Sequence, residues 1–312
     1  MPTFRERIEG GLLGLLIGDA LGVPYEFHSA ASLPPAAEIE FSPPAHFPRA
    51  HAGVPPGTWS DDGAQALALL ASLLGSSTLD LEDFGRRLVA WYEKGYLAVD
   101  GRVFDVGIQT GEAIRRLRSG TPAEKAGPAQ EQSNGNGSLM RVLPLPLWHR
   151  GSDAELVADA QRQSLVTHGH ARSQACCALY CLWARRVLQD VADPWAAAVT
   201  TLRSIYRSGS PELAELESTI RPDEFVKGKG GGYVVDCLWS ARWAAKQRAY
   251  EQVVKAAIGL GNDTDTTACV AGGLAGLRDG VAAIPERWRN NLRGQELVAP
   301  LLERLLQIQA LA

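Results

Sequence analysis

Two short acidic segments carry the residues in this sequence that are best suited to chemistry. Ser60-Asp61-Asp62 and Asp263-Thr264-Asp265-Thr266-Thr267 each come directly before an apolar stretch that is typical of a helix. One aspartate at each place would be explained as a helix N-cap, which contributes about 1 kcal/mol. Two aspartates at each of two helix starts exceed that role. Carboxylates that converge in a partly buried site repel one another, so they need protons or cations.

The types of residue in these segments indicate which cation would bind. Oxygen ligands with no histidine or cysteine nearby favour Mg²⁺ or Mn²⁺ over Zn²⁺. An EF-hand calcium loop is excluded, because its twelfth position requires a bidentate glutamate and here that position is Ser72 or Leu274. From the residues alone, helix capping and metal binding both remain open.

A phosphatase site is a further alternative. Asp263-x-Asp265-x-Thr267 matches the DxDxT signature of haloacid-dehalogenase-like phosphatases, in which the first aspartate is a nucleophile at the end of a buried parallel strand. The preceding residues 258–262 make a poor strand, and the chain lacks the alternation of strands and helices that such a fold needs. These two observations count against the phosphatase.

The helix pattern near the N-terminus has an unusual spacing of glycines. In residues 4–21 and just beyond, Gly10, Gly14, Gly18 and Gly22 recur at every fourth position. On a helix this spacing makes a smooth stripe where a second helix can pack closely. Glycine lowers helix propensity, so we expect this helix to depend on tertiary contacts.

The helix after the second acidic segment is expected to be buried. It consists of Ala, Cys, Val, Gly and Leu after its threonines, with no charge until Arg278. A helix that is apolar on all sides lies inside a protein. We therefore expect its N-terminus, with Asp263 and Asp265, to face the interior or a deep cleft.

Helical patterns also dominate the rest of the chain. Further helices are expected within residues 82–95, 104–118, 153–190, 194–220 and 233–258, and loops at 30–57, 119–138 and 221–232. Few segments alternate with the period of a strand. The sequence predicts an all-α fold: a single compact domain, residues 1–312, of many short helices around a buried central helix, with a two-metal cleft.

Composition limits the possible environments and partners. A net charge of −4 gives no general attraction to nucleic acid or to an anionic membrane. The five cysteines, three of them in one apolar stretch, do not suggest a disulfide framework. We expect a cytoplasmic protein, because the N-terminus lacks the layout of a signal peptide and no apolar run approaches the roughly 18 residues of a membrane span.

Five segments, taken in order, resemble one known family. The sequence is similar to the ADP-ribosylglycohydrolases of the dinitrogenase-reductase-activating type, the ADP-ribosyl-acceptor hydrolases. The segments are GDALGVPYE at 18–26, GTWSDDGA at 57–64, SNGNGSLMR at 133–141, TH at 167–168 and GNDTDTTACVAGGLAG at 261–276. Together they span nearly the whole catalytic domain of such proteins. The resemblance implies an all-α fold with two Mg²⁺ (or Mn²⁺) ions.

The resemblance also implies a set of metal ligands, in which the aspartates are joined by two hydroxyl residues. The set is Ser60, Asp61, Asp62, Asp263, Asp265 and Thr266. The chain departs from the common family pattern at three positions. Ser60 stands for threonine and keeps the hydroxyl, Gly63 stands for a second threonine and loses one, and Asn262 stands for a common glycine.

The segment SNGNGSLMR has a physical reason to bind phosphate. Glycines and amide side chains let backbone N–H groups approach phosphate oxygens, which suggests Ser133, Gly135, Asn136 and Gly137 as diphosphate contacts. An ordinary Gly/Asn turn is the alternative. Other substrate contacts rest mainly on the resemblance, and in each case a structural role is the alternative: Met140, His168, Gly107 and Tyr233.

The activity implied by the resemblance is hydrolysis at C1″ of the distal ribose. The substrate would be an ADP-ribosylated protein or another ADP-ribose conjugate, with an arginine linkage preferred. Glu26 or Asp62 would transfer the proton. Neither a membrane nor nucleic acid is expected as a partner, other than nucleic acid as a modified acceptor. A non-catalytic ADP-ribose-binding protein is the remaining alternative.

Overall fold

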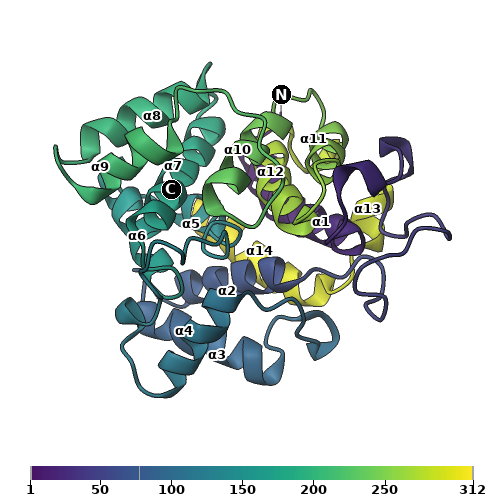
Figure 1. The fold of residues 1–312 in the computed structure, drawn as a ribbon, viewed down its shortest axis with the longest axis horizontal. Helices are drawn as coiled ribbons and strands as arrows, with labels where there is room; N and C mark the ends of the chain where they lie inside the picture. Colours follow the sequence, from purple (N-terminus) through teal and green to yellow (C-terminus); the bar gives the residue numbers. More distant parts are fainter. Residues whose placement is uncertain (1, 77, 311–312) are drawn as a thin grey trace.

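The computed structural model describes residues 2–76 and 78–310, and its elements are α-helices joined by loops and short turns (Figure 1). The helices are α1 (Phe4–Gly22), α2 (Asp61–Gly75), α3 (Leu81–Lys94), α4 (Ile108–Arg118), α5 (Pro144–Trp148), α6 (Asp153–Leu165), α7 (Ala171–Leu188), α8 (Pro194–Ile205), α9 (Pro211–Glu215), α10 (Val234–Ala244), α11 (Tyr250–Ile258), α12 (Thr264–Asp279), α13 (Glu286–Asn291) and α14 (Gln295–Ala310).

Helices α1 and α12 pack backbone to backbone along the glycine stripe of α1. A Cβ atom at Gly14 would lie 2.6 Å from the carbonyl oxygen of Gly272. At Gly18 it would collide with the backbone of Ala268, and at Gly22 with that of Asp265. The predicted close approach of a second helix is thus confirmed, and that second helix is the one that carries the second acidic segment.

Helix α12 is the buried centre of the molecule. Every residue from Thr264 to Leu277 is buried. The helix contacts α1 along its length, and α11, α10, α7 and α2 also pack against it (Figure 1). The predicted all-α domain around a buried central helix is confirmed.

The described part of the chain contains no β-strand; two isolated bridges, Ser29–Gly261 and Gly135–Tyr233, are its only β-type pairings. Asp263 precedes a helix and does not end a parallel strand. The phosphatase alternative is therefore wrong, because its nucleophile must be positioned by a parallel sheet.

The expected helices occur with shifted or divided boundaries. The helix expected from residue 104 begins only at Ile108, because residues 102–107 form no regular structure and Asp105 has the left-handed φ of 54°. The stretch 194–220 divides into α8, α9 and one π-helical turn at Leu216–Ile220. The stretch 233–258 divides into α10 and α11, with Ala249 in extended conformation between them.

The proline-rich segment between α1 and α2 is an ordered loop with its own apolar contacts. Ile39, Phe41 and Phe47 are buried, and the ring of Phe47 packs against that of Tyr25 at 5.4 Å. The Tyr25 hydroxyl donates to the carbonyl oxygen of Glu40. The loop is held in one place beside the start of α2.

Helix α1 corrects one expectation about apolar runs. Residues Phe4–Tyr25 are long and apolar enough to cross a membrane by length and composition. In the structure 89% of the most apolar window is buried inside the protein. The core helix of a globular protein has the same length and composition, so this stretch is weak evidence for a membrane span.

Candidate active site

The N-terminal ends of α2 and α12 meet at one cavity of about 390 Å³. The loops that carry the predicted Gly/Asn segment and the TH pair complete its wall. The cavity is lined by Glu26, Phe27, Asp61, Asp62, Asp105, Gly107, Ile108, Gln109, Thr110, Gly135, Asn136, Gly137, Met140, His168, Gly232, Asp263 and Thr266. Most of the residues predicted for the site from widely separated segments therefore share one cavity.

A third aspartate caps the start of α2. The fully buried carboxylate of Asp19, on α1, accepts hydrogen bonds from the backbone N–H of Ser60 at 2.9 Å and of Gly63 at 2.8 Å. The Ser60 hydroxyl accepts the N–H of Asp62 at 3.3 Å. The helix amides are thus satisfied by other groups, and the carboxylates of Asp61 and Asp62 are left for the cavity.

Packing explains the glycine that replaces a family threonine. A Cβ atom at Gly63 would lie 2.7 Å from Cγ of Trp59 and 2.8 Å from Cδ2 of Leu16. A threonine at this position would require Trp59 or Leu16 to move. The missing hydroxyl is a consequence of local packing beneath the site.

The start of α12 is held by a backbone hydrogen bond, and the carboxylate of Asp263 is bonded to a side chain from another segment. The N–H of Asp263 donates to the carbonyl oxygen of Gly230 at 2.8 Å. Its carboxylate accepts the side-chain amide of Asn136 at 2.7 Å. Asn262, with φ of 64°, adopts the left-handed conformation that glycine favours and asparagine tolerates, which accounts for the third departure from the family pattern.

One hydrogen bond joins the two helix starts directly. The Thr266 hydroxyl donates to Oδ1 of Asp62 at 3.3 Å. Asp265 is fully buried, and its Oδ1 accepts the N–H of Thr266 at 2.8 Å. An oxygen of Glu26 lies within 4.8 Å of carboxylate oxygens of both Asp263 and Asp265.

Burial and mutual repulsion make the carboxylate cluster costly to ionise. Burial, followed by the charges of neighbouring carboxylates, raises the pKa values of Asp61, Asp62 and Asp265 well above the ordinary value. The same two causes raise the pKa of Glu26 to about 10 and that of Asp105 to about 6.

The donor set fits divalent cations. Oδ2 of Asp62 and Oδ2 of Asp265 are buried and have no hydrogen-bond partner. Buried polar atoms without partners are rare in proteins, and here the atoms are hard carboxylate oxygens in a cluster of like charge. Mg²⁺ or Mn²⁺ would satisfy both the unpaired oxygens and the repulsion.

The Gly/Asn segment lies against a buried histidine. A Cβ atom at Gly137 would be 2.8 Å from Cε1 of His168, and one at Gly135 would be 2.6 Å from Oε1 of Gln109. Burial lowers the pKa of His168 to about 3, so its ring is neutral. Nδ1 of His168 is bonded to the Thr167 hydroxyl at 2.8 Å. The close approach of the buried His168 ring favours glycine at position 137, and the loop backbone borders the cavity.

Two predicted substrate contacts lie beside the cavity and not in its lining. The Ser133 hydroxyl donates to the side chain of Gln130 at 3.3 Å. The Tyr233 ring is partly exposed and lies 5.9 Å from the Arg172 guanidinium. Tyr233 is connected to the phosphate segment through its backbone, in the bridge with Gly135.

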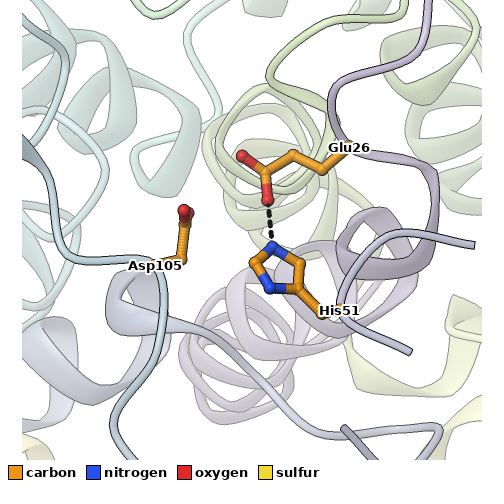
Figure 2. A group of neighbouring side chains, drawn as sticks. All are labelled: Glu26, His51 and Asp105. Atoms are coloured by element: carbon orange, nitrogen blue, oxygen red, sulfur yellow. Dashed lines mark hydrogen bonds and ion pairs between the residues drawn. The ribbon is translucent and has the colours of Figure 1, made fainter. Parts of the chain in front are cut away.

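The structure adds residues that sequence reasoning did not select: Asp19, His51 and Asp105. Figure 2 shows Glu26 with His51 and Asp105 around it. Asp105 stands two positions before Gly107, in a segment already considered, so an acidic side chain beside a pocket glycine was a usable signal. His51 lies in the proline-rich loop and Asp19 in an apolar helix, where no spacing pattern marks them.

Comparisons with known proteins point in one direction. The family model described as ADP-ribosylglycohydrolase matches residues 1–311. The "ADP-ribosylarginine hydrolase Tri1" of Serratia proteamaculans (strain 568) is 30% identical over 96% of this chain and 79% of its own length. The "ADP-ribosyl-[dinitrogen reductase] glycohydrolase" of Rhodospirillum rubrum is 29% identical over 93% of this chain and 92% of its own length.

A solved structure agrees with these relatives. An "ADP-ribosylglycohydrolase-related protein complex" chain superposes with a TM-score of 0.79 at 29% identity, and the match covers 99% of both chains. Sequence and fold thus match over the full length of the domain that builds the cavity. The chain belongs to the ADP-ribosylglycohydrolase family.

Proposed function

We propose that this protein is a divalent-cation-dependent hydrolase that releases ADP-ribose from a modified acceptor, with an arginine linkage as the preferred substrate. The observation that carries the proposal is the cavity where α2 and α12 begin, with its buried carboxylates and the unpaired oxygen of Asp62, together with the unpaired oxygen of Asp265 outside the cavity lining. The names of the relatives support the reaction class, since they describe hydrolases of ADP-ribose linkages.

The cation-binding residues in this proposal are those at the two helix starts. They are Ser60, Asp61 and Asp62 before and within α2, and Asp263, Asp265 and Thr266 before and within α12. Two Mg²⁺ or Mn²⁺ ions bound there would supply a polarised water and fix the hydroxyls of the distal ribose. Asn136 keeps the Asp263 carboxylate oriented through its 2.7 Å hydrogen bond.

The chain's own side chains place the substrate and move the proton. The backbone of Gly135, Asn136 and Gly137 offers a surface for the diphosphate, with the neutral His168 ring behind it. Cleavage at C1″ develops oxocarbenium character that the nearby carboxylates stabilise. Glu26 lines the cavity and is not among the proposed cation ligands, whereas Asp62 is, so Glu26 is the better-placed proton carrier.

Asp105 supports an arginine acceptor. It lines the same cavity and comes from a loop that carries none of the proposed cation ligands. A carboxylate pairs well with a guanidinium group, which presents two parallel N–H donors. The relatives at 30% and 31% identity are named as ADP-ribosylarginine hydrolases, whereas the human ADP-ribosylhydrolase ARH3 is 24% identical.

The test is release of ADP-ribose from arginine-linked and serine-linked peptides in the presence of Mg²⁺. We expect turnover of the arginine-linked peptide, and loss of that activity in Asp263→Asn, in Asp62→Ala and in excess chelator. Glu124→Gln changes an exposed carboxylate that does not line the cavity. It is the matched control and should stay active. Full activity of Asp263→Asn, or of the wild type in chelator, would contradict the cation site.

A non-catalytic ADP-ribose-binding protein is the other outcome of this experiment. It would bind free ADP-ribose in a calorimetric titration but release none from either peptide. Preference for the serine-linked peptide would leave the reaction class intact and remove arginine as the acceptor.

A further inference from the structure

The Glu26 carboxylate has a partner outside the acidic cluster. Nε2 of His51 lies 2.7 Å from Oε2 of Glu26 (Figure 2). The side chains are 16% and 4% exposed, so water competes little for this hydrogen bond. On the other side, a Glu26 oxygen lies within 4.8 Å of the Asp263 and Asp265 carboxylates. Glu26 thus lies between the His51 ring nitrogen and a group of carboxylates that are costly to ionise together.

The position of the His51 ring is set by an unusual backbone conformation and by two aromatic neighbours. Its backbone has φ of 48°, a left-handed conformation that is unfavourable for a residue with a Cβ atom. The centroid of the ring lies 5.5 Å from that of the Phe27 ring and 5.1 Å from that of the Phe104 ring. Non-glycine residues remain in such conformations where the surroundings enforce them, and these cases cluster at functional sites.

The same contact closes the proline-rich loop. After Glu26 the chain first pairs with Asn262 through the backbone of Phe27 and His28, and at its far end Ala50 donates its N–H to the carbonyl oxygen of Pro24 at 2.9 Å. The next residue, His51, makes a second hydrogen bond, between its side chain and that of Glu26. The Glu26 carboxyl group and the end of the proline-rich loop are therefore joined through two neighbouring hydrogen bonds.

We propose that His51 is a positioning residue, which holds the Glu26 carboxyl group toward the cavity and ties its orientation to the end of the proline-rich loop. The inference rests on the proposed function, in which Glu26 carries the proton. Without the His51 ring, the Glu26 carboxyl group would lose its 2.7 Å hydrogen bond and would be free to adopt rotamers that point away from the cavity. The rate of the chemical step would fall while substrate binding through the diphosphate would not.

The experiment uses the full-length protein with Mg²⁺ and the arginine-linked peptide. His51→Gly removes the ring but suits the left-handed backbone, so we expect an unchanged or higher Tm together with a kcat lower by roughly 10- to 100-fold and little change in KM. His51→Gln keeps an N–H donor and should recover part of kcat. His46→Gly, an exposed histidine on the same loop, is the control and should behave as wild type.

A double-mutant cycle separates positioning from a general structural role. In a Glu26→Gln background, His51→Gly should cause no further loss of kcat, because the group it positions is already gone. An equal loss in both backgrounds, or a loss that follows a fall in Tm and is not rescued by His51→Gln, would overturn the proposal.

A spectroscopic measurement tests the pair independently of turnover. The ring nitrogen resonances of His51, assigned by their absence in His51→Gly, should shift in Glu26→Gln. Unchanged resonances would overturn the pairing even in an active enzyme. A wild-type protein inactive on every ADP-ribosylated peptide would contradict the proposed function instead, and the resonances would still decide whether His51 holds Glu26.

Discussion

The starts of α2 and α12 contain similar sequences but are built differently. At α2 two backbone N–H groups, which have no acceptor within their own helix, are capped by the carboxylate of Asp19 from another helix. At α12 the N-cap residue Asp263 makes no side-chain cap hydrogen bond, and within the first turn Oδ1 of Asp265 accepts the N–H of Thr266. The backbone there is fixed by Gly230, which accepts the N–H of Asp263, and by Thr264, whose hydroxyl donates to the carbonyl oxygen of Gly22 at 2.8 Å.

The difference shows how both helix starts leave their aspartates available. Capping is the ordinary reason for an aspartate at a helix start, and at α2 that task is transferred to Asp19. At α12 Asp263 occupies the N-cap position, yet its carboxylate is bonded to Asn136 and not to its own helix. At α2 the cap is thus supplied by another helix, whereas at α12 Asp265 bonds one amide through Oδ1 and leaves its Oδ2 without a partner for a ligand.

The largest expected effect comes from Asp265→Asn, which tests the ligand side of the comparison. We expect kcat/KM to fall about a thousandfold, because cation binding supplies several kcal/mol of transition-state stabilisation. In chelator the variant should be at least as stable as the wild type, since one buried like charge is removed. The rise in Tm that Mg²⁺ causes in the wild type should shrink in the variant. Unchanged activity together with an unchanged Mg²⁺ response would show that α12 contributes no ligand here.

An intermediate effect is expected from Asp19→Ala, which tests the cap of α2. Removing the carboxylate leaves two buried N–H groups without an acceptor, so the free energy of unfolding in urea should fall by about 3 kcal/mol. Asp19→Asn keeps one acceptor oxygen and should lose less. If Asp19→Ala were as stable as the wild type while Mg²⁺ binding disappeared, Asp19 would belong with the ligands and the proposed division of roles would fail.

The smallest effect is expected from Thr264→Val, which tests the support of α12. The substitution preserves shape and removes one neutral hydrogen bond, to Gly22, so stability should fall by about 1 kcal/mol. Activity at a temperature well below Tm should stay near that of the wild type. A loss as large as that of Asp19→Ala would mean that the two helix starts depend equally on a single buried contact.

Local spacing was enough to predict the two packed helices and the acidic and Gly/Asn segments of the site. The glycines of α1 predicted a close helix partner, and the uncharged stretch after Asp265 predicted a buried helix. Both follow from the 3.6-residue period of a helix, which acts over a few neighbouring residues. The aspartate pairs and the Gly/Asn segment were visible because several residues of one chemical type stand together.

By itself, then, the sequence determined the all-α fold, the family and the acidic helix starts. Only the tertiary structure decided that Asp19 serves the backbone, that Asp105 lines the cavity while His51 bonds Glu26, and that Ser133 and Tyr233 lie outside the lining. The physical reason is the path of the loops. Glu26 and His51 are 25 positions apart in a segment without regular structure, where no period relates spacing in the chain to direction in space.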